Sequence, residues 1–305
     1  MLVKLNIRFS NEETMCVDMN TLQNDTSFLD SLVVADHLGL LEAKKNVMFR
    51  YTEKAIVHGN PDRVHEHAKL MENHWLVASK RGFVSYYGYY KKEPILITTS
   101  GMGTGSAAIV FEELVEHGIN KILRVGTCGY YRDYIKPGDI VIPTEILLEG
   151  PSLRYIFPDY LREREISTEI SWLYVREGFY FVKGFEKFVE ILVESVENVL
   201  DEYKEKLSIR YYVGPLHDKD VLHAWREKYS LNPETLMRIK NKVTNLTIAT
   251  DMESGALFTI GHIRNTIVGS ILVAVDFHAN KDTMERQRKG MEIAYKASLE
   301  AISRI

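Results

Sequence analysis

Two spacings of apolar residues recur along this 305-residue chain and predict strands and helices in turn. Residues 94–99 form a short apolar run, which is typical of a strand buried on both faces. Between residues 185 and 203, apolar side chains recur every three or four positions, which predicts the buried face of a helix. Strand and helix patterns alternate without a linker-like change in composition or an internal repeat. This alternation predicts a single α/β domain with a mixed central β-sheet flanked by helices.

The remaining elements follow from the same patterns. Further strands are predicted over residues 54–57, 75–80, 83–90, 121–125, 139–149, 211–213, 246–249 and 266–275, and a C-terminal helix over residues 283–302. Residues 1–31 show no clear period and are predicted to form an N-terminal extension, which leaves residues 32–305 as the domain. Residues 151–183 are aromatic and charged without a clean period, so they are candidates for a lid or an oligomer contact.

The segment 94–129 reads as strand, glycine-rich turn, helix, strand and second polar turn. Glycines at 101, 103 and 105 allow a sharp turn that exposes backbone N–H groups, and Ser106 is a candidate N-cap for the helix. The second turn is predicted over residues 124–129. In open α/β sheets, ligands bind beyond the carboxyl ends of the strands, so we expect the binding site at these two turns.

The two turns permit more than one interpretation. A Gly-x-Gly turn between strand and helix is found in dinucleotide sites, but no carboxylate ends the next strand, at residues 124–126, to hold a ribose. The alternative is a site for a free oxyanion, in which Arg124 and Thr127 supply charge and hydrogen-bond donors. A tight structural turn with a surface arginine is the third possibility.

A third turn has the same character. Residues 58–64 contain Gly59, Asn60, Pro61 and Asp62, a cluster that marks the passage from a strand to a helix. Arg63 then falls in the first turn of that helix, where backbone N–H groups and a guanidinium can meet one anion. A solvated arginine in a capping loop is the alternative.

Composition limits the classes of function. The chain is 45% hydrophobic and 26% charged, as in ordinary globular proteins, and its net charge of −4 argues against a general nucleic-acid partner. No apolar run approaches the roughly 20 residues that span a bilayer, so no membrane partner is expected. The two cysteines imply no disulfide framework, and no signal peptide is visible, so we expect a cytoplasmic protein.

Several polar residues have both a structural and a functional interpretation. His65 and His67 point to nearly opposite faces of a helix, so they and His74 are predicted to be solvated and no metal site is expected. Glu253 fits a capping box with Thr250. Asp276 ends an apolar strand, where it could serve as a helix N-cap or as a general acid.

The motifs together resemble the hexameric nucleoside phosphorylase family, which contains uridine phosphorylases and purine nucleoside phosphorylases. The matching pieces occur in family order. They are HLGL at 37–40, GNPDRV at 59–64, ASKRGF at 78–83, SGMGTGSAAIVFEEL at 100–114, RVGTCG at 124–129, EGPSL at 149–153, DMESGALF at 251–258 and VAVD at 273–276. The resemblance covers roughly residues 35–155 and 208–300.

The resemblance implies a role for each matching residue. It assigns phosphate binding to Gly59, Arg63, Arg81, Arg124 and Thr127, ribose binding to His37, Met252 and Glu253, and base binding to Cys128, Gly129 and Asp276. It makes Arg124, Glu253 and Asp276 the catalytic residues, with Asp276 protonating the leaving base.

The resemblance also implies the partners of the enzyme. Inorganic phosphate is a co-substrate beside the nucleoside, and no metal or organic cofactor is required. Arg81 and His37 resemble residues that reach the active site of an adjacent subunit, which implies a hexamer built from dimers with shared active sites. Phosphorolysis replaces the base by phosphate at the anomeric carbon, so arginines can fix the attacking dianion and a carboxylate suits the developing positive charge.

Departures from the family pattern bear on the substrate. Residues 218–226 lack the Gly-Gln-x-Arg element with which uridine phosphorylases read uracil, and Asp276 stands where those enzymes tend to have Asn. These departures favour purine nucleosides, with uridine as the alternative base. Two further alternatives are a nucleosidase of the same fold, which uses water, and a nucleoside-binding protein without catalysis. Three candidate phosphate arginines argue against the nucleosidase.

Overall fold

The computed structural model describes residues 5–8, 14–17, 36–43, 52–156, 170–203, 208–219, 221–223, 225–276 and 278–305. The chain divides into two compact units, Met1–Asp36 and His37–Ile305. In the first unit, β1 (Leu5–Arg8) pairs antiparallel with β2 (Thr14–Val17). The boundary predicted at residue 31 lies outside the described residues.

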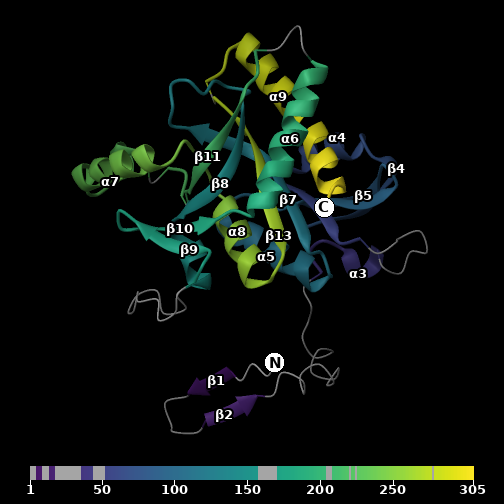
Figure 1. Ribbon diagram of the computed structural model, residues 1–305, viewed down its shortest axis with the longest axis horizontal. Coiled ribbons are helices and arrows are strands. Elements are labelled where there is room, and N and C mark those ends of the chain that lie inside the picture. The colour runs from purple at the N-terminus through teal and green to yellow at the C-terminus, as the bar shows by residue number, and fades with distance from the viewer. Residues whose placement is uncertain are drawn as a thin grey trace. The chain divides into compact units, whose positions relative to one another are not determined.

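One mixed sheet organises the second unit (Figure 1). Its strands are β3 (Lys54–His58), β4 (Glu72–Lys80), β5 (Phe83–Tyr90), β6 (Glu93–Thr99), β7 (Lys121–Tyr130), β8 (Ile140–Leu148), β9 (Leu173–Arg176), β10 (Phe179–Lys183), β11 (Tyr211–Asp218), β12 (Ala249–Asp251) and β13 (Ile267–Ala274). Their order is β4-β5-β6-β3-β7-β12-β11-β8-β10-β9, and β13 pairs with both β7 and β8. The mixed α/β architecture predicted from the sequence is confirmed.

Part of the sheet closes on itself. β13 runs parallel to β7 and antiparallel to β8, while β12 and β11 connect β7 to β8 by the other route. The five strands β7, β12, β11, β8 and β13 therefore form a closed circuit of pairing. β3 and β6 continue outwards from β7 as parallel neighbours, so the carboxyl ends of β3 and β6 meet at one edge.

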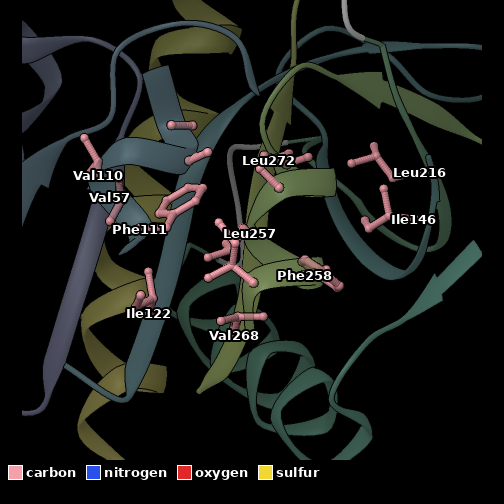
Figure 2. Close-up of a cluster of buried hydrophobic side chains, with 14 of the residues drawn as sticks. Val57, Val110, Phe111, Ile122, Ile146, Leu216, Leu257, Phe258, Val268 and Leu272 are labelled. Atoms are coloured by element: carbon pink, nitrogen blue, oxygen red, sulfur yellow. The ribbon is translucent and has the colours of Figure 1, made fainter. Parts of the chain in front are cut away.

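Helices cover both faces of this sheet. They are α3 (Leu40–Ala43), α4 (Pro61–Ala68), α5 (Thr104–Glu116), α6 (Glu186–Glu202), α7 (Pro233–Leu246), α8 (Ser254–Ile263) and α9 (Lys281–Ser303), with short 3₁₀ turns at Gly150–Tyr155 and Glu227–Tyr229. α5 and α8 pack together over one face, where Phe111, Leu257 and Phe258 join the apolar cluster shown in Figure 2. On the other face, α6 packs beside α9, and Phe188 and Leu192 enter a second cluster.

The sequence patterns predicted many of these elements, but not β9, β10 or α7, and three local predictions are wrong. Residues 126–130 continue β7 instead of forming a turn, because β12 pairs with Gly129 and Tyr130. Leu246 ends α7 and is not part of a strand. Ser106 does not cap α5: the N-cap position is Gly103, and the Ser106 hydroxyl donates to the carbonyl of Ser100 instead (2.7 Å).

Two helical glycines should respond oppositely to the same substitution. A Cβ at Gly290 in α9 would lie 2.3 Å from the carbonyl oxygen of Gly138, whereas a Cβ at Gly105 in α5 would meet no atom of the described residues within 4 Å beyond its own helix. We expect Gly290→Ala to lower the free energy of unfolding by about 1–3 kcal/mol through this backbone clash. Gly105→Ala should leave it unchanged or raise it by up to about 1 kcal/mol, because alanine favours the helix. Urea unfolding measures both; equal effects would contradict the close approach of α9 to residue 138.

Candidate active site

The glycine turns that follow β3 and β6 meet at the carboxyl edge of the sheet. The backbone N–H of Ser100 donates to the carbonyl of His58 (2.7 Å), which joins the two turns directly. A Cβ on Gly59 would lie 3.3 Å from the carbonyl oxygen of Gly101 and 4.0 Å from Nη1 of Arg124. Both turns therefore lie close to Arg124.

Arg124 is the central charged residue of the site. It lies on β7 between β3 and β13, and only 3% of its surface is exposed. Its Nε donates to Oδ2 of Asp251 (3.0 Å), and its Nη2 donates to Oε2 of Glu253. Burial opposes the charged guanidinium, but Glu253 and Asp251 outweigh burial and raise the pKa of Arg124. The residue is therefore a permanent cation, and the interpretation as a surface arginine is wrong.

One donor of this guanidinium remains unused. Nη1 of Arg124 is buried and has no hydrogen-bond partner among the described residues. It is also the Arg124 atom that would lie nearest a Cβ on Gly59. An unsatisfied buried donor is costly, and in a binding site it is satisfied by the ligand. A cationic donor in this position suits an anion.

Gly126 makes room for this arrangement. Residues two apart in a strand face the same side, so residue 126 lies beside the Arg124 side chain. A Cβ there would lie 2.7 Å from Nη2 of Arg124 and 2.9 Å from its Cζ. The sequence analysis assigned Gly126 no role; a glycine two residues from an arginine at the end of a strand is the signal that it offered.

Glu253 and Met252 come to the same place from the segment before α8. The Glu253 carboxylate is 6% exposed and accepts from the backbone N–H of Gly103 (2.7 Å) as well as from Arg124. The hydroxyl of Thr104 donates to the Met252 carbonyl (3.2 Å). The predicted capping box is wrong, because Glu253 occupies the N-cap position without a side-chain cap bond. Its carboxylate serves the site instead.

Arg63 stands in the first turn of α4, as predicted. Asn60 caps this helix by accepting from the N–H of Asp62 (2.9 Å), and Pro61 occupies the first helical position. Arg63 is half-buried, and burial together with the charge of Arg124 lowers its pKa, against opposing contributions from Tyr295 and Glu66. The two guanidiniums are therefore close enough to act on one another, which is the arrangement that an anion would stabilise.

The residues predicted to meet the base lie farther along the same strands. Cys128 of β7 is buried opposite Ala274 of β13, and burial, reinforced by Asp251, raises the pKa of its thiol. Thr127 and Gly129 on either side of it are half-buried. The thiol therefore remains protonated and is no nucleophile at neutral pH.

Asp276 follows β13 and is exposed. It accepts from the backbone N–H of His278 (2.8 Å), while Asn280 is the N-cap of α9, so the N-cap interpretation of Asp276 is wrong. Burial raises the pKa of Tyr130, and the charge of Asp276 adds to this rise. Asp276 thus lies near the far end of β7, beyond Cys128 and Gly129.

Two predicted site residues stand apart from this cluster. Arg81 is exposed at the tip of the β4–β5 hairpin with a left-handed φ of 51°. The ring of His37 bonds through Nδ1 to Oε2 of Glu113 (2.9 Å). Within the part of the chain that the structure describes, no hydrogen bond or ion pair joins either residue to Arg124.

Of the three histidines predicted to be solvated, two are exposed and one is buried. His65 and His74 are exposed, and the hydroxyl of Tyr86 lies 3.0 Å from Nδ1 of His65. His67 is fully buried, so the prediction is wrong for this residue. Its ring packs inwards because it bonds to His58 and to the carbonyl of Tyr295.

Asp218 is a buried carboxyl that the sequence analysis did not single out as a site residue. It pairs with Asp251 in the parallel register of β11 and β12, and it accepts from the hydroxyl of Ser152 (2.7 Å). Burial, followed by the charge of Asp251, raises its pKa well above the usual range. Asp218 is therefore a candidate neutral carboxyl beside the anionic pair of Arg124. The sequence signal that could have identified Asp218 is an aspartate at the end of a predicted strand.

Comparisons with known proteins place the chain in a family. A family profile described as the phosphorylase superfamily matches residues 53–304. The uridine phosphorylase of Haemophilus influenzae is 28% identical over 230 residues, which cover 73% of this chain and 79% of that protein. The guanosine phosphorylase of Halorubrum lacusprofundi is 26% identical over 257 residues, covering 82% and 93% respectively.

A solved structure supports the same assignment. The crystal structure of uridine phosphorylase from Vibrio fischeri superimposes with a TM-score of 0.64 at 25% identity and covers 84% of this chain and 94% of that chain. Within the described residues, no helix combines the length and the apolar character that crossing a bilayer requires. The chain belongs to the phosphorylase superfamily and is an enzyme of the nucleoside phosphorylase type, a pentosyltransferase.

Proposed function

We propose that this protein cleaves the N-glycosidic bond of a nucleoside with inorganic phosphate, giving a free base and (deoxy)ribose 1-phosphate. The observation that carries the proposal is the unsatisfied Nη1 of the buried Arg124, beside the Gly59 turn and within electrostatic range of Arg63. Both arginines are cationic, and the turn supplies backbone N–H groups. A dianion bound there gains charge-assisted hydrogen bonds and satisfies the buried donor.

The phosphate is the nucleophile in this scheme. Arg63 and Arg124 hold two of its sides, Thr127 offers a hydroxyl, and Arg81 of an adjacent subunit completes the clamp. Binding by several donors fixes the direction from which a phosphate oxygen approaches the anomeric carbon, so the reaction gains from orientation. Phosphate is a co-substrate, and the scheme uses no metal or organic cofactor.

The sugar binds next to this anion. The Glu253 carboxylate is held by Gly103 and Arg124, so it is oriented before a substrate arrives. It accepts from ribose hydroxyls and stabilises the positive charge that develops on the sugar ring as the base departs. Met252 packs against the ribose, and His37 of an adjacent subunit reaches the 5′-hydroxyl.

For the base, uridine is the first candidate. The pattern of Asp276 and residues 218–226 favours purines, but several of the similar proteins are uridine phosphorylases, at 26–28% identity over 230–249 residues or 38% over 120 residues. The guanosine phosphorylase among the relatives keeps a purine as the second candidate. Cys128, Gly129 and Asp276 lie where either base would be bound.

The proposed assembly rests on the two predicted site residues that lie apart from Arg124. Arg81 and His37 serve a neighbouring site only in a homo-oligomer, and a hexamer built from dimers is the assembly that we propose. Its partners are the nucleoside and phosphate, and the cytoplasm is its expected compartment.

A nucleoside panel tests the proposal. The full chain is incubated with uridine, thymidine, inosine, guanosine and adenosine, with and without phosphate, and the released base and sugar product are measured. We expect base release that depends on phosphate and yields ribose 1-phosphate, fastest with uridine. Free ribose without any phosphate requirement would identify a nucleosidase, and binding without base release would leave only a nucleoside-binding protein.

Arg63 provides the cleaner test of the anion site, because removal of Arg124 would also leave Asp251 and Glu253 buried without their cation. We expect Arg63→Gln to lower kcat/KM for phosphate by about a hundredfold or more, since one charge-assisted contact is lost in the transition state. Steady-state kinetics at saturating nucleoside measures the change. The control is Arg288→Gln, which removes an exposed arginine of α9. Equal kinetics in the two variants would exclude Arg63 from the site.

Gly126 tests the geometry of Arg124. We expect Gly126→Ala to shift the guanidinium without breaking its ion pairs, so that the chain stays folded, because the displaced atoms end a flexible side chain. An ångström of misplacement lowers kcat/KM by about a hundredfold. The matched control is Gly214→Ala, a buried strand glycine whose nearest neighbour is the apolar side chain of Ile248. Full activity in Gly126→Ala would contradict the close fit.

Asp276 separates the two bases. A general acid contributes about 10²–10⁴-fold to proton transfer, so Asp276→Asn should reduce any cleavage of purine nucleosides at least tenfold more than cleavage of uridine. Parallel kcat/KM measurements with inosine and uridine give the ratio. A uniform loss with both substrates would remove Asp276 from base selection.

A further inference from the structure

A pair of buried histidines stands directly behind the phosphate turn, defined as residues 59–63. His58 ends β3 immediately before Gly59, and His67 lies on α4; neither side chain is exposed. Nε2 of His58 lies 2.8 Å from Nδ1 of His67, and Nε2 of His67 lies 3.0 Å from the carbonyl oxygen of Tyr295 in α9. The pair thus connects both ends of the phosphate turn with the helix packed behind it.

The positions of the hydrogens on the two rings follow from the last acceptor in this series of hydrogen bonds. The Tyr295 carbonyl only accepts, so Nε2 of His67 carries a hydrogen. A neutral imidazole has one N–H, so Nδ1 of His67 accepts and Nε2 of His58 donates to it. That leaves Nδ1 of His58 without a hydrogen. This nitrogen is buried and has no hydrogen-bond partner in the described part of the chain.

Burial and the groups around the pair keep it neutral in the free protein. Burial, then the neighbouring ring of His67, then Arg63 and Arg124 hold the pKa of His58 well below its usual range. A backbone group of Val125 acts in the opposite direction and favours the protonated ring. Burial also lowers the pKa of His67, to about 3, against the effect of its bond to the Tyr295 carbonyl.

Charged or titratable groups from three elements act on the pair. Arg63 and Glu66 come from α4 and Arg124 from β7. α9 contributes Tyr295, whose ring stacks on His67 with centroids 4.6 Å apart and whose hydroxyl donates to Glu66 (3.3 Å). The two guanidiniums are therefore the cations that oppose a proton on His58, and they are the groups assigned to the phosphate.

We propose that His58 and His67 form a proton-accepting positioning pair, which is neutral in the empty site and takes up one proton from solvent at Nδ1 of His58 when a phosphate dianion binds between Arg63 and Arg124. The dianion offsets the two guanidinium charges, so it removes the part of the barrier to protonation that Arg63 and Arg124 add to burial and to the ring of His67. The added proton turns the unpartnered nitrogen into a donor and gives the phosphate turn a cation behind it. This inference rests on the proposed phosphate site.

The pair predicts a definite pH dependence. If binding takes up a proton, affinity for the dianion falls as pH rises, by up to about tenfold per pH unit between the pKa of His58 in the free and in the bound protein. Sulfate separates this effect from the ionisation of phosphate, because it remains a dianion throughout. Any proton taken up when sulfate binds is therefore bound by the protein and not by the anion.

Calorimetry of the full chain provides the test. Sulfate and inorganic phosphate are titrated at neutral pH in two buffers of different ionisation enthalpy, which gives the number of protons taken up per site. We expect about one with sulfate in the wild type, none in His58→Asn, and about one in the control His65→Gln, which changes an exposed histidine of α4, the helix that carries His67.

A second measurement avoids the risk that His58→Asn misfolds. Nitrogen-15 NMR of the wild-type histidines reports the protonation of each ring nitrogen directly, and Nδ1 of His58 should change from bare to protonated as phosphate is added. Anion binding without proton uptake and without this change would overturn the inference and leave the proposed function standing. If neither anion binds and no phosphorolysis occurs, the proposed function fails and the inference fails with it.

Discussion

The buried ion pairs of Arg124 hold the site together. One guanidinium from β7 is bonded to Asp251 at the end of β12 and to Glu253 before α8, and Glu253 in turn accepts from the glycine turn after β6. Charges this deep lose their hydration, so they are stable only while every partner is present, and removal of one partner costs about 3–5 kcal/mol. The arrangement therefore fixes three distant segments relative to one another at the edge where substrate would bind.

This constraint depends on missing side chains as much as on charged ones. Gly59 lets its turn approach the carbonyl of Gly101, and Gly126 leaves the space that the guanidinium fills. With a Cβ at residue 126 the guanidinium would have to shift from its present position. Once two of its nitrogens are bound in this way, the third, Nη1, is left with a free hydrogen-bonding capacity beside the turn. The geometry that stabilises the fold thus creates the unsatisfied donor.

Specific contacts also hold the segments that carry the site. α9 packs against the sheet, with Gly290 in contact with the backbone of Gly138, and it carries Tyr295 to the ring of His67. His67 in turn bonds to His58, the residue that immediately precedes Gly59. The phosphate turn is therefore held by its own helix cap at Asn60 and by two imidazoles beneath it.

The sequence by itself determined the α/β class, the positions of most strands and helices, and the glycine turns at the carboxyl ends of β3 and β6. These follow from local physics: the period of apolar residues, and glycine or asparagine where the chain must turn. Tertiary structure decided the partners. Pairing with β12 continues β7 through Gly129. Glu253 bonds to Arg124 instead of capping a helix, and His67 is buried against His58 instead of being solvated. Local period records which face of an element is buried, but not which distant segment lies opposite it, and the partner across that contact determines whether a carboxylate or an imidazole is a cap, a solvated group or part of a site.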